Sequence, residues 1–233
     1  MIRIFLTGYM GAGKTTLGKA FARTLNVPFV DLDWYMEERF HKTVGELFAE
    51  RGEAGFRELE RNMLREVGAF ENVVISTGGG APCFFDNMDF MNHSGKTVFL
   101  NVHPDVLFRR LRVAKQQRPI LQGKEDEELK EFIIQALEKR APFYSQAQYI
   151  FNADELEDRS QIEKSVQRLR DLLKLWFICA FWTCLIEKTC LSDCILWIYN
   201  YFCCLKYFIN TTEYIKMRKW RIEDSEELYN ITG

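Results

Sequence analysis

Near its amino terminus the chain carries a segment, Gly8–Thr15, that reads Gly-Tyr-Met-Gly-Ala-Gly-Lys-Thr and fits the pattern Gly-x-x-x-x-Gly-Lys-Ser/Thr. The apolar run 2–7 before it predicts a buried strand, and the apolar periodicity after it predicts a helix to about Leu25. Glycines at such a turn let backbone N–H groups converge on phosphate oxygens, and the helix directs its positive end at the same anion. Lys14 can reach the β- and γ-phosphates, and the Thr15 hydroxyl can coordinate Mg²⁺. The segment therefore predicts a nucleoside triphosphate site.

Strand-like and helix-like segments alternate through the first 175 residues, which is typical of an α/β protein with a parallel sheet covered on both faces. We expect strands at residues 2–7, 29–31, 73–76, 97–102 and 149–151. We expect helices within residues 34–68, one helix that begins near Pro104, one that ends at about Arg140 and one that ends at about Leu175. Two Ser/Thr-x-x-Glu boxes, Thr43–Glu46 and Ser160–Glu163, predict helix starts, and the polar stretch 115–124 predicts a loop.

Charge and composition exclude some classes of function. The net charge of −2 and the pI near 6.0 argue against a dedicated nucleic-acid binder, which is usually basic. The first 20 residues show no secretory signal, and Cys83 is the only cysteine before residue 176. We therefore expect a cytoplasmic protein without a disulfide framework, and no membrane association of residues 1–175.

Two carboxylates follow the second expected strand. Asp31 and Asp33 are two residues apart, so on a strand they would face the same side, at the edge of the sheet where α/β proteins place ligands. One carboxylate could hold Mg²⁺ and the other could accept a proton from an attacking hydroxyl. The alternative is a solvated turn in which an aspartate caps the next helix.

The arginines have similar alternatives. Arg57 has glutamates at helical spacing on both sides, and alone this favours a surface ion pair. Arg140 alone could be a cation near a helix carboxyl end. The basic stretch 109–118 could be a solvated helix face or a lid that clamps an anion.

Six motifs occur together in one order. They are the run 8–16, Asp31-Leu32-Asp33, Phe56-Arg57, Ser76-Thr77-Gly78-Gly79-Gly80, Arg118-Pro119-Ile120-Leu121 and Arg140-Ala141-Pro142-Phe143-Tyr144. In this order and spacing the chain resembles the shikimate kinase family over about residues 1–175. Each motif beyond the P-loop is weak alone, but the set is highly specific.

The resemblance implies an α/β P-loop kinase of the nucleoside-monophosphate-kinase type, with a five-stranded parallel sheet of order 2-3-1-4-5 flanked by helices. It implies a lid at about 112–124 and substrate-binding helices at about 33–62. The implied reaction transfers the γ-phosphoryl group of ATP to the 3-hydroxyl of shikimate, giving shikimate 3-phosphate and ADP in the chorismate and aromatic amino acid pathway. ATP is the implied co-substrate, Mg²⁺ the implied cofactor, and we expect a monomer.

The resemblance also implies roles for individual residues. Those that would bind ATP are Gly11, Ala12, Gly13, Lys14, Thr15, Thr16, Arg110 and Arg118. Those that would bind shikimate are Asp33, Arg57, Gly78, Gly79, Gly80 and Arg140. The implied catalytic residues are Lys14, Asp33 as the candidate base, and Arg118 from the lid. Thr15 would bind Mg²⁺, with Asp31 and Ser76 in its outer shell.

Two other functions fit part of the pattern. Another small-metabolite kinase, such as a gluconate kinase, would also use an arginine-lined pocket, although the segments 118–121 and 140–144 favour shikimate. A nucleotide-dependent switch would need the P-loop but no convergence of Asp33, Arg57 and Arg140.

Residues 176–233 differ from the rest in composition. They hold six of the seven Cys and four of the five Trp, and they lack Pro. Their apolar runs, 175–186 and 195–209, are shorter than the roughly 20 residues that a membrane-spanning helix needs. We interpret this tail as read-through past a stop codon or a mistaken gene end; a structured appendage, such as an interfacial anchor or an oligomerisation hairpin, is the alternative.

Overall fold

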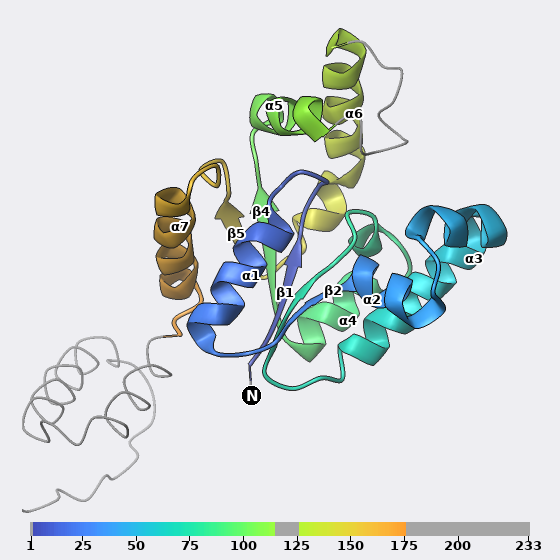
Figure 1. Cartoon of the computed structure of the whole chain (residues 1–233), viewed down its shortest axis with the longest axis horizontal. Coiled ribbons are helices and arrows are strands. Elements are labelled where there is room, and N and C mark those ends of the chain that lie inside the picture. Colours follow the sequence, from blue (N-terminus) through green and yellow to red (C-terminus); the bar gives the residue numbers. More distant parts are fainter. Residues whose placement is uncertain (1, 115–125, 176–233) are drawn as a thin grey trace, which may run out of the picture. The chain divides into compact units, whose positions relative to one another are not determined.

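The computed structural model describes residues 2–114 and 126–175 of the 233 (Figure 1). The tail at 176–233 and the expected lid from residue 115 onward lie outside the described residues. The helices and strands are β1 Arg3–Thr7, α1 Lys14–Leu25, β2 Phe29–Asp31, α2 Leu32–Phe40, α3 Val44–Val67, β3 Val73–Ser76, η1 Ala81–Cys83, α4 Asn87–Ser94, β4 Lys96–Asn101, α5 Pro104–Ala114, α6 Asp126–Tyr144, β5 Tyr149–Asn152 and α7 Arg159–Leu172. Among these, no helix has both the length and the apolar character needed to cross a membrane.

The five strands form one parallel sheet in the order β2-β3-β1-β4-β5. β1 lies at its centre, where Phe5 pairs with Ile75 of β3 and with Thr97 of β4. Each expected strand is present to within one residue at either end. The predicted fold class and strand order are therefore confirmed.

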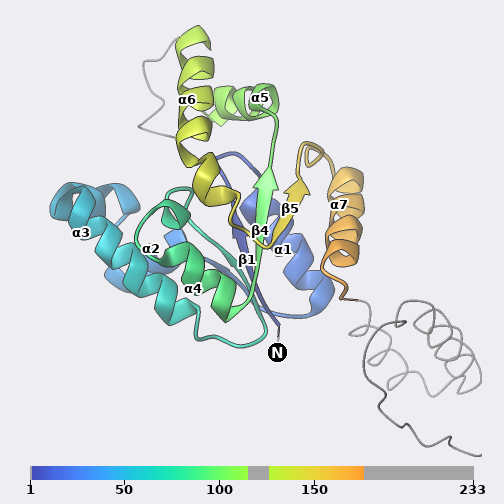
Figure 2. The ribbon, with the colours of Figure 1, turned by 180° about the vertical axis from the view of Figure 1, so that it is seen from behind.

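Side chains of β1 alternate between two hydrophobic cores, as the pleat of a strand requires. Ile4 and Leu6 pack into one core with the apolar faces of α1 and α7, while Phe5 packs into the other with side chains of α3 and α4. The two views of the ribbon show α1 and α7 on one face of the sheet and α4 on the other (Figures 1 and 2). Burial on both faces explains why these strands read as short apolar runs.

Parallel strands bring their carboxyl ends to one edge of the sheet, which is where ligands bind in such folds. The P-loop follows Thr7 at the end of β1, Asp31 ends β2 and Ser76 ends β3. Three motifs that are distant in the sequence therefore meet at this edge.

One predicted helix start is confirmed and one is wrong. Thr43 caps α3 in a complete capping box with Glu46. At α7, however, Asp158 is the cap, because its side chain already accepts from the Gln161 backbone N–H at 2.8 Å, and Ser160 lies inside the helix. The helix α4 had no clear sequence signal, and α6 continues past Arg140 to Tyr144.

Candidate functional site

A crevice of about 820 Å³ opens at the carboxyl edge of the sheet. P-loop residues form one wall, and residues at the ends of β2 and β3 form another. Arg109, Arg110 and Glu157 close the side nearest α5 and the segment before α7. The crevice therefore joins three of the six motifs, namely the run 8–16, the Asp31-Leu32-Asp33 segment and the Ser76–Gly80 segment.

Backbone conformation shapes the P-loop. Gly13 precedes α1 with a φ of 90°, and a Cβ on it would lie 2.5 Å from Leu156 Cδ1, so only glycine fits there. The Lys14 amine donates to the carbonyl oxygens of Gly8 and Tyr9 at 2.8 and 3.0 Å. The P-loop thus has the geometry of an anion cradle at a helix amino terminus.

The predicted P-loop ligands do not all face the crevice in the same way. Gly11, Gly13, Lys14, Thr15 and Thr16 line the crevice. The side chain of Ala12 is fully buried in the core beside α1, so this residue can face a ligand through its backbone alone.

The two aspartates reach the crevice by different routes. Asp31 ends β2 and caps α2: its Oδ1 accepts from the Asp33 backbone N–H at 3.2 Å, and its Oδ2 accepts from the Thr15 hydroxyl at 2.8 Å. Asp33 lies in the first turn of α2, so the expectation that both carboxylates share a strand face is wrong. Both nevertheless line the crevice, together with Ser76. Asp31 therefore caps a helix, as the alternative had it, and both carboxylates still meet at the crevice, as predicted.

Thr15 and Asp31 supply the hard oxygen atoms that Mg²⁺ prefers. Mg²⁺ usually keeps few protein ligands and binds substrate phosphates and water as well, so one hydroxyl with nearby carboxylates suits it. The residues present therefore fit this ion at the junction of the P-loop and β2.

The triple glycine Gly78–Gly80 faces charged side chains at each of its three positions. A Cβ on Gly78 would lie 3.0 Å from Asp33 Oδ1, and one on Gly80 would lie 2.9 Å from Arg57 Nη1. A Cβ on Gly79 would lie 3.4 Å from Arg140 Nη1. The predicted acceptor residues from α2, α3 and α6 therefore converge on one short backbone segment.

Arg57 belongs to a buried ion pair rather than to the helix surface. Its Nη1 lies 2.8 Å from Glu60 Oε2, and the side chains are 15% and 2% exposed. Its second partner, Glu53, lies 3.9 Å away and is 64% exposed. The Arg57 guanidinium also lies 4.2 Å from the centre of the Phe84 ring. These contacts fix the direction in which Arg57 points, and the surface-pair alternative is wrong.

Glu60 is a site residue that the sequence reasoning considered only as a partner on the surface. Burial raises the pKa of this carboxyl, opposed by the neighbouring Arg57. A Cβ on Gly78 would lie 2.8 Å from Glu60 Oε1, which places Glu60 beside the acceptor residues. The available signal was its position on the apolar face of α3, in register with the buried Phe56 and Leu64.

Arg140 is hydrogen-bonded to the backbone of the triple glycine. Its Nη1 donates to the Gly79 carbonyl at 3.2 Å, and its guanidinium lies 5.2 Å from the centre of the Tyr9 ring. The same carbonyl accepts from the Tyr144 hydroxyl at 2.6 Å. Arg140 thus has a defined place beside Gly79, which lines the crevice, instead of serving as a general cation at the end of α6.

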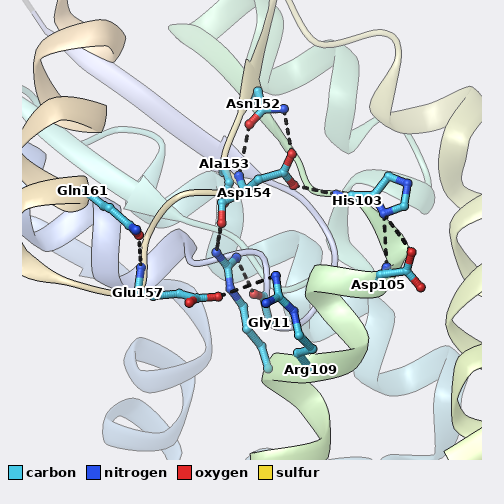
Figure 3. Close-up of polar contacts among 10 residues, drawn as sticks. Gly11, His103, Asp105, Arg109, Asn152, Ala153, Asp154, Glu157 and Gln161 are labelled. Carbon is cyan, nitrogen blue, oxygen red and sulfur yellow. Dashed lines mark hydrogen bonds and ion pairs between the residues drawn. The ribbon is translucent and has the colours of Figure 1, made fainter.

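Arg110 connects α5 to the P-loop and to the segment after β5. Its guanidinium donates to the carbonyl oxygen of Gly11 at 3.3 Å, of Ala153 at 3.2 Å and of Asp154 at 2.7 Å (Figure 3). Arg110 also lines the crevice. Because three carbonyls hold its guanidinium, its position relative to the P-loop is fixed.

The neighbours of Arg110 in the basic stretch point elsewhere. Arg109 forms an ion pair with Glu157 (Figure 3); the two side chains lie 3.9 Å apart, and Arg109 is 63% exposed. Arg112 pairs at 3.6 Å with Asp126, at the start of α6. Arg118 lies outside the described residues. In the described part of this stretch, Arg109 and Arg110 therefore line the crevice, whereas Arg112 links α5 to α6.

The chain is similar to proteins of one known family. The family model described as shikimate kinase matches residues 10–170. A protein from Bacteroides thetaiotaomicron named shikimate kinase is 87% identical over 175 residues, which are 75% of this chain and 100% of that protein. One of the same name from Bacteroides fragilis is 80% identical over 175 residues, 75% of this chain and 98% of that protein.

Solved structures give the same result. The crystal structure of shikimate kinase from Bacteroides thetaiotaomicron has a TM-score of 0.70 and 84% sequence identity, and covers 74% of this chain and 98% of that one. The shikimate kinase from Acinetobacter baumannii in complex with shikimate has a TM-score of 0.64 at 30% identity, and covers 76% of this chain and 96% of that one.

Proposed function

Because this chain belongs to the shikimate kinase family, we propose that its crevice transfers the γ-phosphoryl group of ATP to the 3-hydroxyl of shikimate, giving shikimate 3-phosphate and ADP. The observation that carries this proposal is the triple glycine, whose members face Asp33, Arg140 and Arg57 in turn at the same edge as the P-loop. A carboxylate and two guanidinium groups around a bare backbone suit a small hydroxylated carboxylic acid.

At the nucleotide end, the P-loop N–H groups and the amino end of α1 would hold the phosphates of ATP. Lys14 would leave its carbonyl partners for the β- and γ-phosphates, where its charge offsets the charge that develops during transfer. Thr15 would hold Mg²⁺, with Asp31 and Ser76 in the outer shell. The ion would neutralise phosphate charge when bound.

At the acceptor end, Asp33 would accept a hydrogen bond from the hydroxyl that attacks and take its proton. Arg57 and Arg140 would pair with the carboxylate, since a planar guanidinium can bind both carboxylate oxygens. The glycines would let the ring approach the backbone closely. Together these contacts would hold the hydroxyl in line with the phosphoryl group.

Two further arginines complete the proposal. Arg118 would reach the transferring phosphate from the lid and stabilise its charge. Arg110 would contact ATP from the crevice wall, and its bonds to Gly11, Ala153 and Asp154 support a fixed position for that contact.

A coupled assay of ADP release tests the proposal on the full chain. With ATP and Mg²⁺, shikimate should stimulate ADP release, whereas gluconate and nucleoside monophosphates should not. Arg57→Ala and Arg140→Ala should raise the KM for shikimate and leave the KM for ATP near that of the wild type. Stimulation by gluconate or a nucleotide instead would refute the acceptor, and unchanged turnover in both variants would favour a nucleotide switch.

The domain organisation is part of the proposal. Residues 1–175 would form the kinase, working as a monomer in the cytoplasm, and residues 176–233 would be dispensable. The match to relatives over 175 residues, nearly the whole of each relative, supports this division. Deleting 176–233 should therefore leave ADP release and solubility intact or improved, and loss of activity on truncation would refute it.

A further inference from the structure

Tyr144 makes one short polar contact from a buried position. It is the last residue of α6 and is 1% exposed. Its hydroxyl donates to the Gly79 carbonyl oxygen at 2.6 Å. Its ring stacks on Phe99 of β4, with ring centres 4.9 Å apart and planes 20° apart. The ring is thus fixed by packing, and the hydroxyl meets both the Gly79 carbonyl oxygen and the Arg140 side chain.

The Gly79 carbonyl is shared by two donors. The Tyr144 hydroxyl and Arg140 Nη1 both donate to this oxygen, at 2.6 and 3.2 Å. A carbonyl oxygen has two lone pairs, so the two bonds complete its capacity. Because a peptide group is planar, fixing this oxygen also fixes the Gly79–Gly80 peptide plane. The orientation of the glycine segment and the direction of Arg140 therefore depend on the same atom.

The hydroxyl keeps its proton under ordinary conditions. Burial raises the pKa of Tyr144 far above its usual range, despite the neighbouring Arg140 cation. Across the neutral pH range the phenol is therefore a constant donor. This matches a role in holding a carbonyl and not a role in proton transfer.

We propose that Tyr144 is a positioning residue for the acceptor: through the Gly79 carbonyl, its hydroxyl sets the place of the glycine segment and of Arg140 in the shikimate pocket. This inference rests on the proposed function. Tyr144 does not touch the substrate, since it is buried behind Gly79, which lines the crevice. Its effect reaches the acceptor through groups that do.

Tyr144→Phe removes the hydroxyl and keeps the ring. We expect the KM for shikimate to rise about tenfold, equivalent to about 1.4 kcal/mol. We expect kcat and the KM for ATP to stay within about twofold, because the P-loop contacts are untouched. The measurement is steady-state ADP release by the full chain, with each substrate varied in turn, together with the Tm from circular dichroism.

Tyr35→Phe is the matched control. Tyr35 donates to Glu66 Oε1 at 2.7 Å and packs edge-on against Phe70, but it contributes nothing to the lining of the crevice. It should keep the wild-type KM for shikimate, and its Tm should fall by no more than that of Tyr144→Phe, because Tyr35 is less buried. A second variant, Phe99→Leu, removes the ring support and keeps the hydroxyl. Because the Phe99 ring also holds the hydroxyl in place, this variant should lower the Tm and raise that KM, but by less than Tyr144→Phe does.

Three results would overturn the inference. They are a wild-type KM for shikimate in Tyr144→Phe, an equal rise in Phe99→Leu, and a Tyr144→Phe protein that fails to fold, which would give the hydroxyl a purely structural role. Failure of the proposed function looks different. In that case the wild type would not respond to shikimate, and the same comparison would be made with the acceptor that it does phosphorylate.

Discussion

Replacing Glu60 with alanine should destabilise the protein by about 3 kcal/mol, because it leaves the Arg57 cation without its buried partner. Removing one member of a fully buried ion pair costs about 3–5 kcal/mol. Arg57 keeps 15% exposure, and Glu53 remains 3.9 Å away, so we take the lower end of that range. For a domain of this size, about 3 kcal/mol corresponds to a fall in Tm of about 6–12 °C.

Glu53→Ala provides the matched control. Glu53 pairs with the same guanidinium, but it is 64% exposed. Exposed pairs of this kind contribute about 0–1 kcal/mol. Because the two variants remove the same functional group from the same partner, the difference between them isolates the effect of burial.

The pH dependence provides a second test, with Glu60→Gln. Burial raises the pKa of the Glu60 carboxyl above its ordinary value of 4.5. A raised folded-state pKa means that the folded state binds a proton more tightly than the unfolded state. The stabilisation from this group is complete below the unfolded pKa and is lost as the pH rises through the folded pKa. The stability of Glu60→Gln relative to the wild type should therefore increase as the pH rises from about 4.5.

Equilibrium unfolding in urea, followed by circular dichroism at several pH values, gives these free energies. The reasoning would be refuted if Glu60→Ala and Glu53→Ala were equally stable within about 0.5 kcal/mol. It would also be refuted if the relative stability of Glu60→Gln fell with rising pH.

Three further outcomes are expected. Asp33→Asn should lower kcat by a factor of about 10²–10⁴ with an unchanged circular dichroism spectrum, and near-normal turnover would exclude Asp33 as the base. Chelation with EDTA should stop ADP release until excess Mg²⁺ is added, and activity that persists in EDTA would exclude the Mg²⁺ requirement. Thr43→Ala should lower the Tm by about 2–4 °C through loss of the capping box, with activity retained, and an unchanged Tm would show that this cap contributes little.

Local sequence patterns predicted the fold well where each element has its own signal. The β-branched run at Val73–Ser76 and the capping box at Thr43 needed only neighbouring residues. The box at Ser160 failed because a competing cap, Asp158, lies two residues earlier and satisfies the same end of the helix. The helix α4 was missed because it is short and rich in Asn, Asp, His and Ser, which have modest helix propensity.

The residues of the site were predicted from the sequence, but the hydrogen bonds and ion pairs among them depend on tertiary contacts. The motifs identified Asp33, Arg57 and Arg140, and the structure brings them to the triple glycine. Helical spacing places Glu60 on the apolar face of α3, but no local pattern shows that it pairs there with Arg57, or that the Tyr144 hydroxyl meets a carbonyl 65 residues away in the sequence. Such contacts follow from how α3 and α6 pack on the sheet.

The close approach at the triple glycine has a genetic consequence. At Gly78 and Gly80 a new Cβ would meet the charged ends of Glu60, Asp33 and Arg57, which would have to leave the places that they hold around the triple glycine. By contrast, a Cβ on Gly45 would meet nothing nearer than 4.0 Å. In a library of random variants, selected in a strain that depends on this gene for its aromatic amino acids, codon 45 should accept alanine. At codons 78 and 80 alanine should fail to support growth, because it would displace side chains that surround the triple glycine.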